Sequence, residues 1–444
     1  MKRYINTLIA IIVLAALWAG FNYYNKRKAK ETTADANKPK ELVVPVKQDQ
    51  VRSFTIAPHE GEPITCTLDG KTWAISQPRP LAADQNAVTS YVGSLIGLDV
   101  ASVVDQHPAN LKDFGLDPPA NVLTVSTSGT PAQVKLLLGD ATPTGDGLFA
   151  QVAGSARLIT LPGYARSTLE KSLFDLRDRR VVTLDNDQIQ RLDVTAPGKS
   201  FTLTKNPDGV WDLVLPPAVR AETFSVQNML SGVQGLAMAS LLKEAKSGAG
   251  DYGFGKPTLT VKFTAPSGSQ TVTVGKKDGS NYDAMNSALA PVFTVPSDFV
   301  TRFQVDPATL RTKSFFNFSS FDAKNVDITT PKEHRVFEQK DFKWKQTSPA
   351  AKDETTEKME DLLNGLTGMQ AASFPKGSAG NLAAFGLAKP LYTFKVTYGD
   401  KNTVEIVNVG SASDHYYAAR STDALPGEIS KTNLDSIDKA LGAL

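Results

Sequence analysis

The sequence has little of the chemistry that metal sites, disulfides and nucleic-acid binding require. Of its 444 residues only Cys66 is a cysteine, which permits no intrachain disulfide and no thiolate metal cluster. The 48 Lys and Arg residues nearly balance the 46 Asp and Glu residues, so the single-sign excess of a nucleic-acid binder is missing. Four histidines occur without metal-ligand spacing: His59, His107, His334 and His415. We therefore expect no metal, no cofactor and no nucleic-acid partner.

The chain does have enough apolar material for a folded body. Hydrophobic residues make up 41% of it and 32 residues are glycine, which are ordinary shares for a globular protein. At about 150 residues per domain, the length predicts roughly three domains.

The N-terminus carries a long uncharged run. Between Arg3 and Lys26 lie 22 residues without a charge, which would form roughly 33 Å of helix, enough to span a bilayer. A cleaved signal peptide is the alternative, but its apolar core would be shorter and its cleavage site closer. We predict a transmembrane anchor over residues 1–25, followed by a polar tether over residues 26–46 that contains Pro39 and Pro45.

The orientation of this anchor has two interpretations. More basic residues follow the run than precede it, and by the positive-inside rule this favours a cytoplasmic body. A short N-terminus, one anchor and a large body are also the layout of exported, signal-anchored bacterial proteins. The residues alone leave both open.

Three tryptophans mark an internal repeat. Each is followed five residues later by a proline, and 42 residues later by a glycine between an aromatic and a large apolar residue. An Asp-Gly turn precedes the first two tryptophans, whereas Asp341-Phe342 precedes the third. The tryptophans are Trp73, Trp211 and Trp344, and the motifs are Phe114-Gly115-Leu116, Tyr252-Gly253-Phe254 and Phe385-Gly386-Leu387. Fixed offsets of this kind predict three copies of one fold.

An amphipathic helix is predicted between each tryptophan and its glycine motif. Four apolar residues recur at the spacing i, i+3, i+4, i+7, which lines one helix face. They are Val88, Tyr91, Val92 and Leu95, then Val226, Met229, Leu230 and Val233, then Met359, Leu362, Leu363 and Leu366. Acids precede each face: Asp84, Glu222, and Asp353 with Glu354. A glycine follows each face, where a left-handed C-cap would end the helix: Gly97, Gly235 and Gly368.

Each copy then continues with about four short alternating runs, which predict an antiparallel meander. A closing helix is expected near residues 164–176, 297–303 and 432–441. The predicted class is α+β: one N-terminal transmembrane helix, then three tandem repeats, each a hairpin, an amphipathic helix, an antiparallel meander and a closing helix. The repeats are expected at residues 47–183, 184–322 and 323–444.

Few residues qualify as candidates for catalysis. The stretch from Gly250 to Pro257 begins like a phosphate-binding loop, but Pro257 stands where Ser or Thr is required and a strand follows. His415 has Asp414, Tyr416, Tyr417 and Arg420 nearby, yet on a strand Asp414 would face the opposite side. We expect His415 and His334 to be surface histidines, and no catalytic, cofactor-binding or metal residue is assigned.

Two further residue types have a structural and a functional interpretation. Cys66 lies in an apolar run without a basic neighbour to lower its pKa, which favours inert packing. The three repeated tryptophans are expected to be core anchors, and ligand-stacking platforms are the alternative.

These motifs resemble a known family. An anchor, a Trp with a downstream Pro, an amphipathic helix, Phe/Tyr-Gly-Leu-x-x-Pro and a strand ending in Gly139, Gly275 or Gly410 are similar to the bacterial domain of unknown function family 4340. The resemblance covers about residues 45–444 and rests on structural positions. Members are commonly found with ABC-transporter permease and ATPase components and with gliding-type auxiliary proteins. It implies an extracytoplasmic accessory role and an outward-facing body.

The expected function is therefore that of a non-catalytic, membrane-anchored scaffold or binding component of an ABC-type envelope transport assembly. It would sit in the bacterial inner membrane with its body facing the periplasm or exterior. An envelope glycan-binding protein is one alternative, and a hydrolase acting on envelope polymer is another. The glycan alternative requires the tryptophans to be exposed in a groove.

Overall fold

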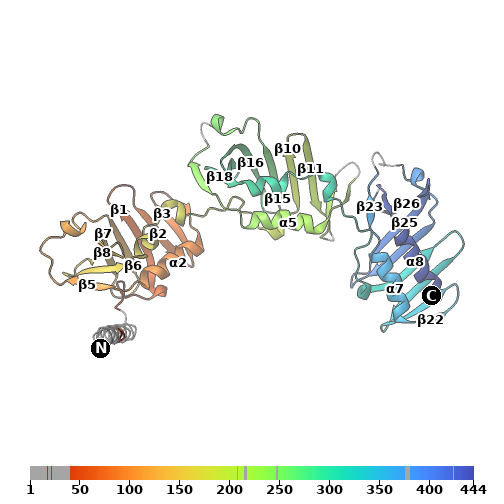
Figure 1. The fold of residues 1–444 in the computed structure, drawn as a ribbon, viewed down its shortest axis with the longest axis horizontal. Helices are drawn as coiled ribbons and strands as arrows, with labels where there is room; N and C mark the ends of the chain where they lie inside the picture. The colour runs from red at the N-terminus through yellow and green to blue at the C-terminus, as the bar shows by residue number, and fades with distance from the viewer. Residues whose placement is uncertain are drawn as a thin grey trace, which may run out of the picture. The chain divides into compact units, whose positions relative to one another are not determined.

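Three antiparallel sheets of nine strands, with the same strand order, make up the fold. The computed structural model describes residues 41–207, 209–214, 218–246, 249–375, 381–423 and 425–444, together with Trp18 and Asn22 (Figure 1). The chain divides into two compact units, Met1–Arg179 and Arg180–Leu444. The first unit contains one sheet, and the second contains two. We call the sheets with their helices repeat 1, repeat 2 and repeat 3.

The strands of the three repeats correspond one to one. Repeat 1 has β1 (Val51–Pro58), β2 (Ile64–Asp69), β3 (Thr72–Gln77), β4 (Leu81–Ala82), β5 (Ser102–Asp105), β6 (Asn121–Thr127), β7 (Gln133–Ala141), β8 (Gly147–Val152) and β9 (Leu158–Pro162). Repeat 2 has β10 (Arg191–Ala196), β11 (Lys199–Lys205), β12 (Trp211–Val214), β13 (Val219–Arg220), β14 (Ser240–Lys243), β15 (Leu259–Ala265), β16 (Gly268–Asp278), β17 (Asn281–Asn286) and β18 (Val292–Pro296). Repeat 3 has β19 (Ala323–Thr329), β20 (His334–Lys340), β21 (Lys343–Ser348), β22 (Lys352–Glu354), β23 (Ala371–Ser373), β24 (Tyr392–Tyr398), β25 (Thr403–Ala412), β26 (His415–Arg420) and β27 (Gly427–Ile429).

One strand pairing joins the two halves of each sheet. In repeat 1 the order is β4-β3-β2-β1-β6-β7-β8-β9-β5, so β1 pairs with β6 although the main helix and β5 intervene in sequence. The register runs from Val51 opposite Thr127 to Pro58 opposite Asn121. The strand after the main helix crosses to the far edge of the sheet. The predicted hairpin and meander are therefore parts of one continuous sheet.

The predicted α+β class is wrong, because the fold is mostly β. The prediction named the first hairpin and the meander as separate elements and did not join them into one sheet. It missed the short edge strands β4 and β5 with their counterparts, and it missed the pairing of β1 with β6. Long-range pairing of this kind leaves no local pattern in the sequence.

Helices cover one face of each sheet. The main helices are α2 (Gln85–Ile96), α5 (Thr223–Gln234) and α7 (Thr356–Thr367). The closing helices are α3 (Ala165–Leu169) with α4 (Leu173–Leu176), then α6 (Ser297–Phe303), then α8 (Lys431–Ala443). Single turns of 3₁₀-helix add η1 (Gln48–Gln50), η2 (Lys112–Phe114), η3 (Asn186–Gln188), η4 (Ala249–Tyr252), η5 (Pro307–Leu310), η6 (Ser320–Asp322) and η7 (Leu382–Phe385). Each main helix packs beside a closing helix, as α7 does beside α8.

The main helices bury the apolar face that their spacing predicts. In α7 the buried residues are Met359, Leu362, Leu363 and Leu366. Carboxylates cap the first two main helices, since Asp84 and Glu222 accept hydrogen bonds from backbone amides of the first turn. In repeat 3 the hydroxyl of Thr355 caps α7 in place of the predicted acids.

The predicted left-handed C-caps are not formed. Gly97 and Gly368 end α2 and α7 with φ of −86° and −76°, which any residue can adopt. A Cβ on Gly97 would stand 3.1 Å from the carbonyl oxygen of Gly93, and this crowding explains a glycine there.

The three tryptophans are core residues. Trp73, Trp211 and Trp344 are 8%, 5% and 2% exposed. In repeat 1 the side chain of Gln85 accepts a hydrogen bond from the backbone N–H of Trp73 and donates one to its carbonyl, which ties the strand to α2. The prediction of core anchors is confirmed.

A close approach of backbone explains the paired glycine motifs. The backbone carbonyl of the aromatic residue in each motif lies close to a glycine within β7, β16 or β25, which is Gly139, Gly275 or Gly410. A Cβ on Gly275 would overlap the carbonyl oxygen of Tyr252, and one on Gly139 would overlap that of Phe114. Only glycine fits at these positions.

The predicted anchor, residues 1–25, lies outside the described residues except for Trp18 and Asn22. No helix in the described part of the chain is long and apolar enough to cross a membrane. The last residues of the predicted tether are not a free linker, because Val43 and Val44 are buried in repeat 1. The predicted repeat boundary after residue 183 lies beyond the division at Arg179.

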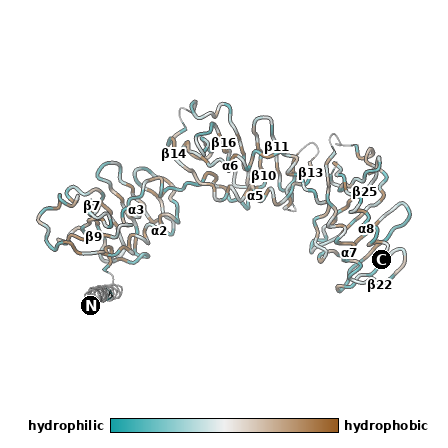
Figure 2. Tube along the Cα trace, in the orientation of Figure 1, coloured by the Kyte–Doolittle hydropathy of each residue, from teal (hydrophilic) through white to brown (hydrophobic). Residues whose placement is uncertain are grey.

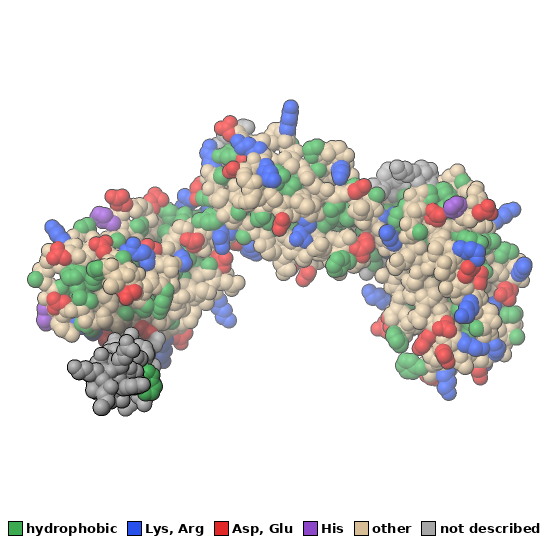
Figure 3. All heavy atoms as spheres, in the orientation of Figure 1, with side chains coloured by type: hydrophobic (Ala, Val, Ile, Leu, Met, Phe, Trp, Pro, Cys, Tyr) green, Lys and Arg blue, Asp and Glu red, His purple; other side chains and the backbone are tan. Residues whose placement is uncertain are grey.

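The surface matches the balanced composition. Hydrophobic residues recur along the strands and helices, and hydrophilic ones gather in the turns (Figure 2). On the face shown in Figure 3, basic and acidic side chains are interspersed over every repeat. No patch of one sign dominates that face.

Replacing Gly275 by alanine is expected to destabilise the protein by about 2 kcal/mol or more, because the new Cβ forces backbone apart. The control is Gly255→Ala, between η4 and β15 of the same repeat, where a Cβ meets nothing within 4 Å. Chemical denaturation measures both. Equal effects of the two substitutions would contradict the close-approach explanation.

Candidate functional site

A short extended segment leads into each repeat, and the first two of its three residues are buried. Its first backbone N–H donates a hydrogen bond to the carbonyl of the residue that follows the glycine ending the main helix. These bonds join Val43 to Leu98 (2.9 Å), Val181 to Leu236 (3.0 Å) and Phe315 to Met369 (3.3 Å). We call residues 43–45, 181–183 and 315–317 the lead-in segments. Because buried backbone N–H and carbonyl groups need hydrogen-bond partners, each lead-in segment requires donors and acceptors from the sheet beside it.

In repeat 2 two amide side chains provide these hydrogen-bond partners. Gln270 accepts a hydrogen bond from the backbone N–H of Thr183 at 3.0 Å. Asn286 donates to the carbonyl of Val181 at 2.6 Å and to the side-chain oxygen of Gln270 at 3.1 Å. Both side chains are buried. The pair is neutral and satisfied, which is how a buried polar group avoids a desolvation penalty.

In repeat 3 two charged side chains occupy the corresponding positions. Glu405 accepts from the backbone N–H of Asn317 at 2.8 Å, and Arg420 donates through Nε to the carbonyl of Phe315 at 2.8 Å. Arg420 also donates to the carbonyl of Ser314. The backbone contacts of the neutral pair are thus kept while two charges are buried.

Repeat 1 has neither pair. Pro45 stands in its lead-in segment where the other repeats have Thr183 and Asn317, and proline has no N–H to satisfy. The corresponding sheet positions hold Val134 and Val152, which follow from the registers of the strands. The same site is therefore apolar, neutral polar and charged in the three repeats.

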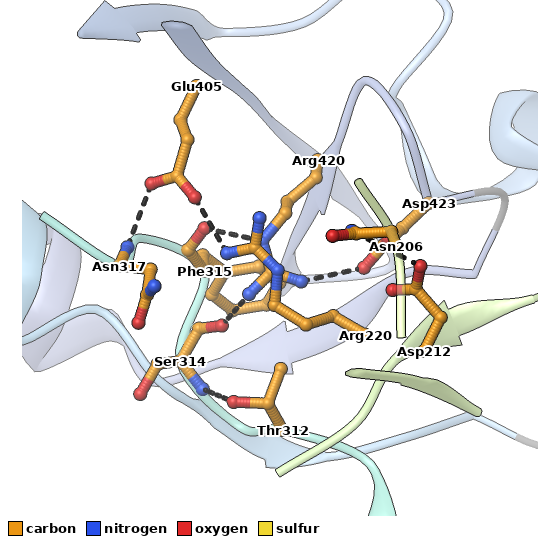
Figure 4. A network of polar contacts seen from close by, with 10 residues as sticks. All are labelled: Asn206, Asp212, Arg220, Thr312, Ser314, Phe315, Asn317, Glu405, Arg420 and Asp423. Atoms are coloured by element: carbon orange, nitrogen blue, oxygen red, sulfur yellow. Dashed lines mark hydrogen bonds and ion pairs between the residues drawn. The ribbon is translucent and has the colours of Figure 1, made fainter. Parts of the chain in front are cut away.

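The charge in repeat 3 reaches into repeat 2. Arg220, at the end of β13, donates to Glu405 Oε1 at 2.6 Å (Figure 4). Glu405 is 5% exposed and the Arg220 side chain 21%. Both belong to the compact unit Arg180–Leu444. One carboxylate thus bridges the lead-in segment of its own repeat and an arginine of the preceding repeat.

A second ion pair completes the charge balance. Arg420 Nη1 lies 2.9 Å from Asp423 Oδ2, and both side chains are about 10% exposed or less. Burial, and next the nearby charge of Arg220, lower the pKa of Arg420. Figure 4 shows both guanidinium groups between the two carboxylates. We call Arg220, Glu405, Arg420 and Asp423 the junction network.

Arg311 adds a contact beside the junction network. Its backbone pairs with Ala221 of repeat 2, whereas its guanidinium donates to the carbonyl of Leu425 at 2.6 Å. The same guanidinium lies 3.8 Å from the ring centroid of Phe374 in repeat 3. Burial lowers the pKa of Arg311 to about 10. A planar cation stacked on an aromatic face is a favourable contact once water is excluded.

Asp212 lies next to this network on β12. It accepts from the side chain of Asn206 at 3.4 Å. Burial raises the pKa of Asp212, and the carboxylate of Asp423 adds to the rise while Arg220 and Arg420 oppose it.

The predicted candidate His415 is exposed and bonds to an acid other than the one beside it in sequence. Its Nδ1 lies 2.7 Å from Glu428 Oε1, and Ser373 Oγ donates to the other oxygen of Glu428 at 2.8 Å. A nucleophile must bond to the base, yet here the carboxylate stands between hydroxyl and imidazole. Asp414 is in the turn, with a φ of 65°.

The remaining candidates also have structural roles or lie at the surface. His334 is exposed and pairs with Asp327 at 2.8 Å. Burial raises the pKa of the Cys66 thiol to about 12, so the prediction of inert packing is confirmed. The run from Gly250 to Pro257 leads into β15, without the helix that a phosphate-binding loop requires. Among the described residues no group of three or more His, Cys, Asp and Glu side chains could hold a metal ion.

Repeat 3 also has an open groove of about 890 Å³. It lies between the β19–β20 turn, the start of β24 and the last turns of α8. Tyr392 and Tyr416 line it, and the hydroxyl of Tyr392 donates to Asp438 at 2.6 Å. Burial, and next this hydrogen bond, raise the pKa of Tyr392 to about 12.

Sequence reasoning missed the junction network. Arg420 was noted only as a neighbour of His415, and Arg220, Glu405 and Asp423 were not noted. A signal was present, because aligning the repeats places Val134, Gln270 and Glu405 in one column. A position that changes from apolar to charged between copies points to a changed neighbour.

Comparison with known protein families identifies the family of this chain. The model of the domain of unknown function DUF4340 matches residues 73–217 and 211–390, and the chain belongs to this family. The two matches begin at Trp73 and Trp211, one repeat apart. No curated protein and no solved structure matches the chain.

The Arg220–Glu405 pair is expected to couple by about 1–3 kcal/mol in a double-mutant cycle, because Glu405 is buried. Glu405→Gln is the chosen variant, because the corresponding position of repeat 2 is Gln270 and a glutamine keeps an acceptor for the N–H of Asn317. Arg220→Gln completes the cycle, with unfolding free energies from chemical denaturation. The control cycle is the exposed pair Lys431–Asp435, expected to couple by about 0.5 kcal/mol or less. Equal coupling in the two cycles would contradict a special role for the buried pair.

Asp212→Asn is expected to stabilise the protein at neutral pH. The folded-state pKa of Asp212 is raised, so its contribution to stability is full below the unfolded pKa of about 4 and is lost as pH rises through the folded pKa. Asparagine does not ionise, so the variant does not lose this stability as pH rises. The unfolding free energies of the two proteins should converge as pH falls below about 4. A difference that widens toward acid pH would refute this assignment.

Proposed function

We propose that the chain is a non-catalytic scaffold or binding component of an ABC-type envelope transport assembly. The main supporting observation is the junction network, in which the half-buried Arg220 of repeat 2 pairs with the buried Glu405 of repeat 3. Buried ion pairs with complete hydrogen bonding favour one arrangement of the parts they join. A fixed arrangement of two sheets suits a protein that presents surfaces to partners.

The repeated residues support the same proposal. The positions shared by the three repeats are tryptophans in cores and glycines at close backbone approaches. The side chains at these positions pack rather than react. What the repeats have in common is therefore a means of building a sheet, and what differs is the surface and the junctions.

The proposed location is outside the cytoplasm, with an anchor in the inner membrane. The uncharged run between Arg3 and Lys26 is long enough for a transmembrane helix. The accessory role beside permease and ATPase components is what the family resemblance implies. The proposed partners are accordingly membrane proteins of an ABC-type assembly.

Cross-linking in intact cells followed by detergent extraction and capture of the chain is the direct test of partners. We expect transporter permease or ATPase subunits to be captured with the wild-type chain. Glu405→Gln with Arg220→Gln is expected to reduce capture, because the arrangement of repeats 2 and 3 is loosened. A reporter fused after Leu444 should be active outside the cytoplasm. Recovery of the chain without transporter subunits, or a cytoplasmic reporter, would refute the proposal.

The glycan-binding alternative has lost its original basis, because the three tryptophans are buried. The groove of repeat 3 supports it more weakly through Tyr392, Tyr416 and Asp438. The cluster of His415, Glu428 and Ser373 gives a polymer hydrolase little support, because its carboxylate lies between the hydroxyl and the imidazole. The scaffold proposal accounts for more of the observed contacts.

A further inference from the structure

The backbone of the repeated tryptophan is bonded differently in the three repeats. In repeat 1 the Gln85 side chain accepts a hydrogen bond from the N–H of Trp73 at 2.8 Å. The same amide donates to the carbonyl of Trp73 at 2.9 Å and to that of Ala83 at 3.0 Å. In repeat 3 Trp344 pairs directly with Glu354 in the register of β21 and β22. A carboxamide therefore stands between two strands in repeat 1, whereas the strands of repeat 3 pair without one.

Repeat 2 has neither arrangement. The carbonyl of Trp211 accepts a hydrogen bond from the N–H of Ala221 at 2.8 Å. The N–H and carbonyl of one strand residue point to the same side, so the N–H of Trp211 also points toward Ala221. The two residues are not paired in the register of β12 and β13, and within the described ranges the N–H of Trp211 has no hydrogen-bond partner. Thr223 stands at the position of Gln85, twelve residues after the tryptophan, and its shorter side chain forms no such bond.

A pocket of about 470 Å³ lies beside this tryptophan, and we call it the repeat 2 pocket. Trp211 and Thr223 both line it, and Leu230 of α5 forms part of its wall. The counterparts of Leu230 in the other main helices, Val92 and Leu363, are buried, whereas Leu230 is only half-buried. The main helix of repeat 2 is therefore less covered than the others, at the place where the carboxamide of repeat 1 is missing.

Two opposite charges line the repeat 2 pocket. Asp187 belongs to η3 and Lys205 ends β11, and the other polar side chains of the lining are uncharged. Both charged residues are exposed, and neither forms an ion pair with another residue that the structure describes. A carboxylate and an ammonium group on the walls of one pocket are complementary to a ligand that carries both charges.

We propose that the repeat 2 pocket binds a small zwitterionic carboxamide, the chemical class of free glutamine. The ligand's carboxamide takes the place of the Gln85 amide, accepting from the N–H of Trp211 and donating to the carbonyl of Ala221. Its ammonium group faces Asp187 and its carboxylate faces Lys205. The volume of about 470 Å³ is within the range of small-molecule sites. The proposal concerns the purified chain alone and does not depend on transporter partners.

Repeat 1 supplies the substitution that should close the site. Thr223→Gln places an amide where Gln85 lies in repeat 1, so it should raise the Tm by about 2–4 °C and abolish ligand binding. Thr356→Gln is the matched control, because it is the same change at the same helix position of repeat 3, where Trp344 already pairs with Glu354. The control should leave ligand binding unchanged and should not raise the Tm.

Isothermal titration calorimetry of the purified full-length chain with L-glutamine measures the binding, and we expect a single saturable site. L-Glutamate has nearly the same size, but its side-chain carboxylate cannot donate to the carbonyl of Ala221. Butanamide has the carboxamide without the two charges. Each of these two compounds should bind at least about tenfold more weakly than L-glutamine. Asp187→Asn and Lys205→Gln should each weaken L-glutamine binding by about tenfold and leave the Tm unchanged, because both side chains are exposed.

Several results would overturn the proposal. One is the absence of saturable L-glutamine binding, which would leave the pocket to water. Others are equal affinity for L-glutamine and L-glutamate, or binding that Thr223→Gln leaves unchanged. A Tm that Thr223→Gln does not raise would show that the N–H of Trp211 needs no carboxamide, and would also overturn it. If Thr223→Gln does not fold, unchanged L-glutamine binding by both Asp187→Asn and Lys205→Gln would decide against the site.

Discussion

The junctions of this protein depend on the backbone of three short lead-in segments. The first two residues of each segment are buried, so their backbone groups need partners, and in repeats 2 and 3 the N–H of the third residue bonds to a side chain of the sheet. The structure contains three solutions to this constraint. Repeat 1 removes the N–H with Pro45, repeat 2 uses Gln270 and Asn286, and repeat 3 uses Glu405 and Arg420. The sheets themselves are nearly identical in order, so these solutions are where the copies differ most in chemistry.

The charged pair of repeat 3 makes a contact that the neutral pair of repeat 2 does not make. A carboxylate has oxygens to spare, so Glu405 can accept from its own lead-in segment and also from Arg220. Beside the buried Glu405 and the half-buried Arg220, the ion pair of Arg420 with Asp423 keeps the charges balanced. Gln270 in repeat 2 makes the backbone contact without a charge. Glu405 therefore bonds to the lead-in segment of its own repeat and also joins repeat 3 to repeat 2 through Arg220.

The sequence predicted the repetition, the main helices and the buried tryptophans, because offsets and helical spacing are local patterns. The mostly-β fold class was not predicted, because β1 pairs with β6 and no sequence pattern links these two distant segments. The junction network was also missed, because Arg220 and Glu405 are far apart in sequence and the change from Val134 and Gln270 to Glu405 was not interpreted. The glycines after the main helices were located correctly but explained wrongly, because Gly97 and Gly368 are not left-handed. Asp341-Phe342 was noticed only as a weaker turn, and in the structure both residues have the positive φ that their two-residue turn requires.

The coupling free energy between positions 183 and 270 tests the central claim most directly. Gln270→Val alone removes the acceptor of the part-buried N–H of Thr183, which should cost about 1–3 kcal/mol. Thr183→Pro removes that N–H, as Pro45 does in repeat 1. If the lead-in backbone dictates the side chain beside it, Gln270→Val should cost far less in the Thr183→Pro background, as measured by chemical denaturation. Strictly additive effects of the two substitutions would contradict the account.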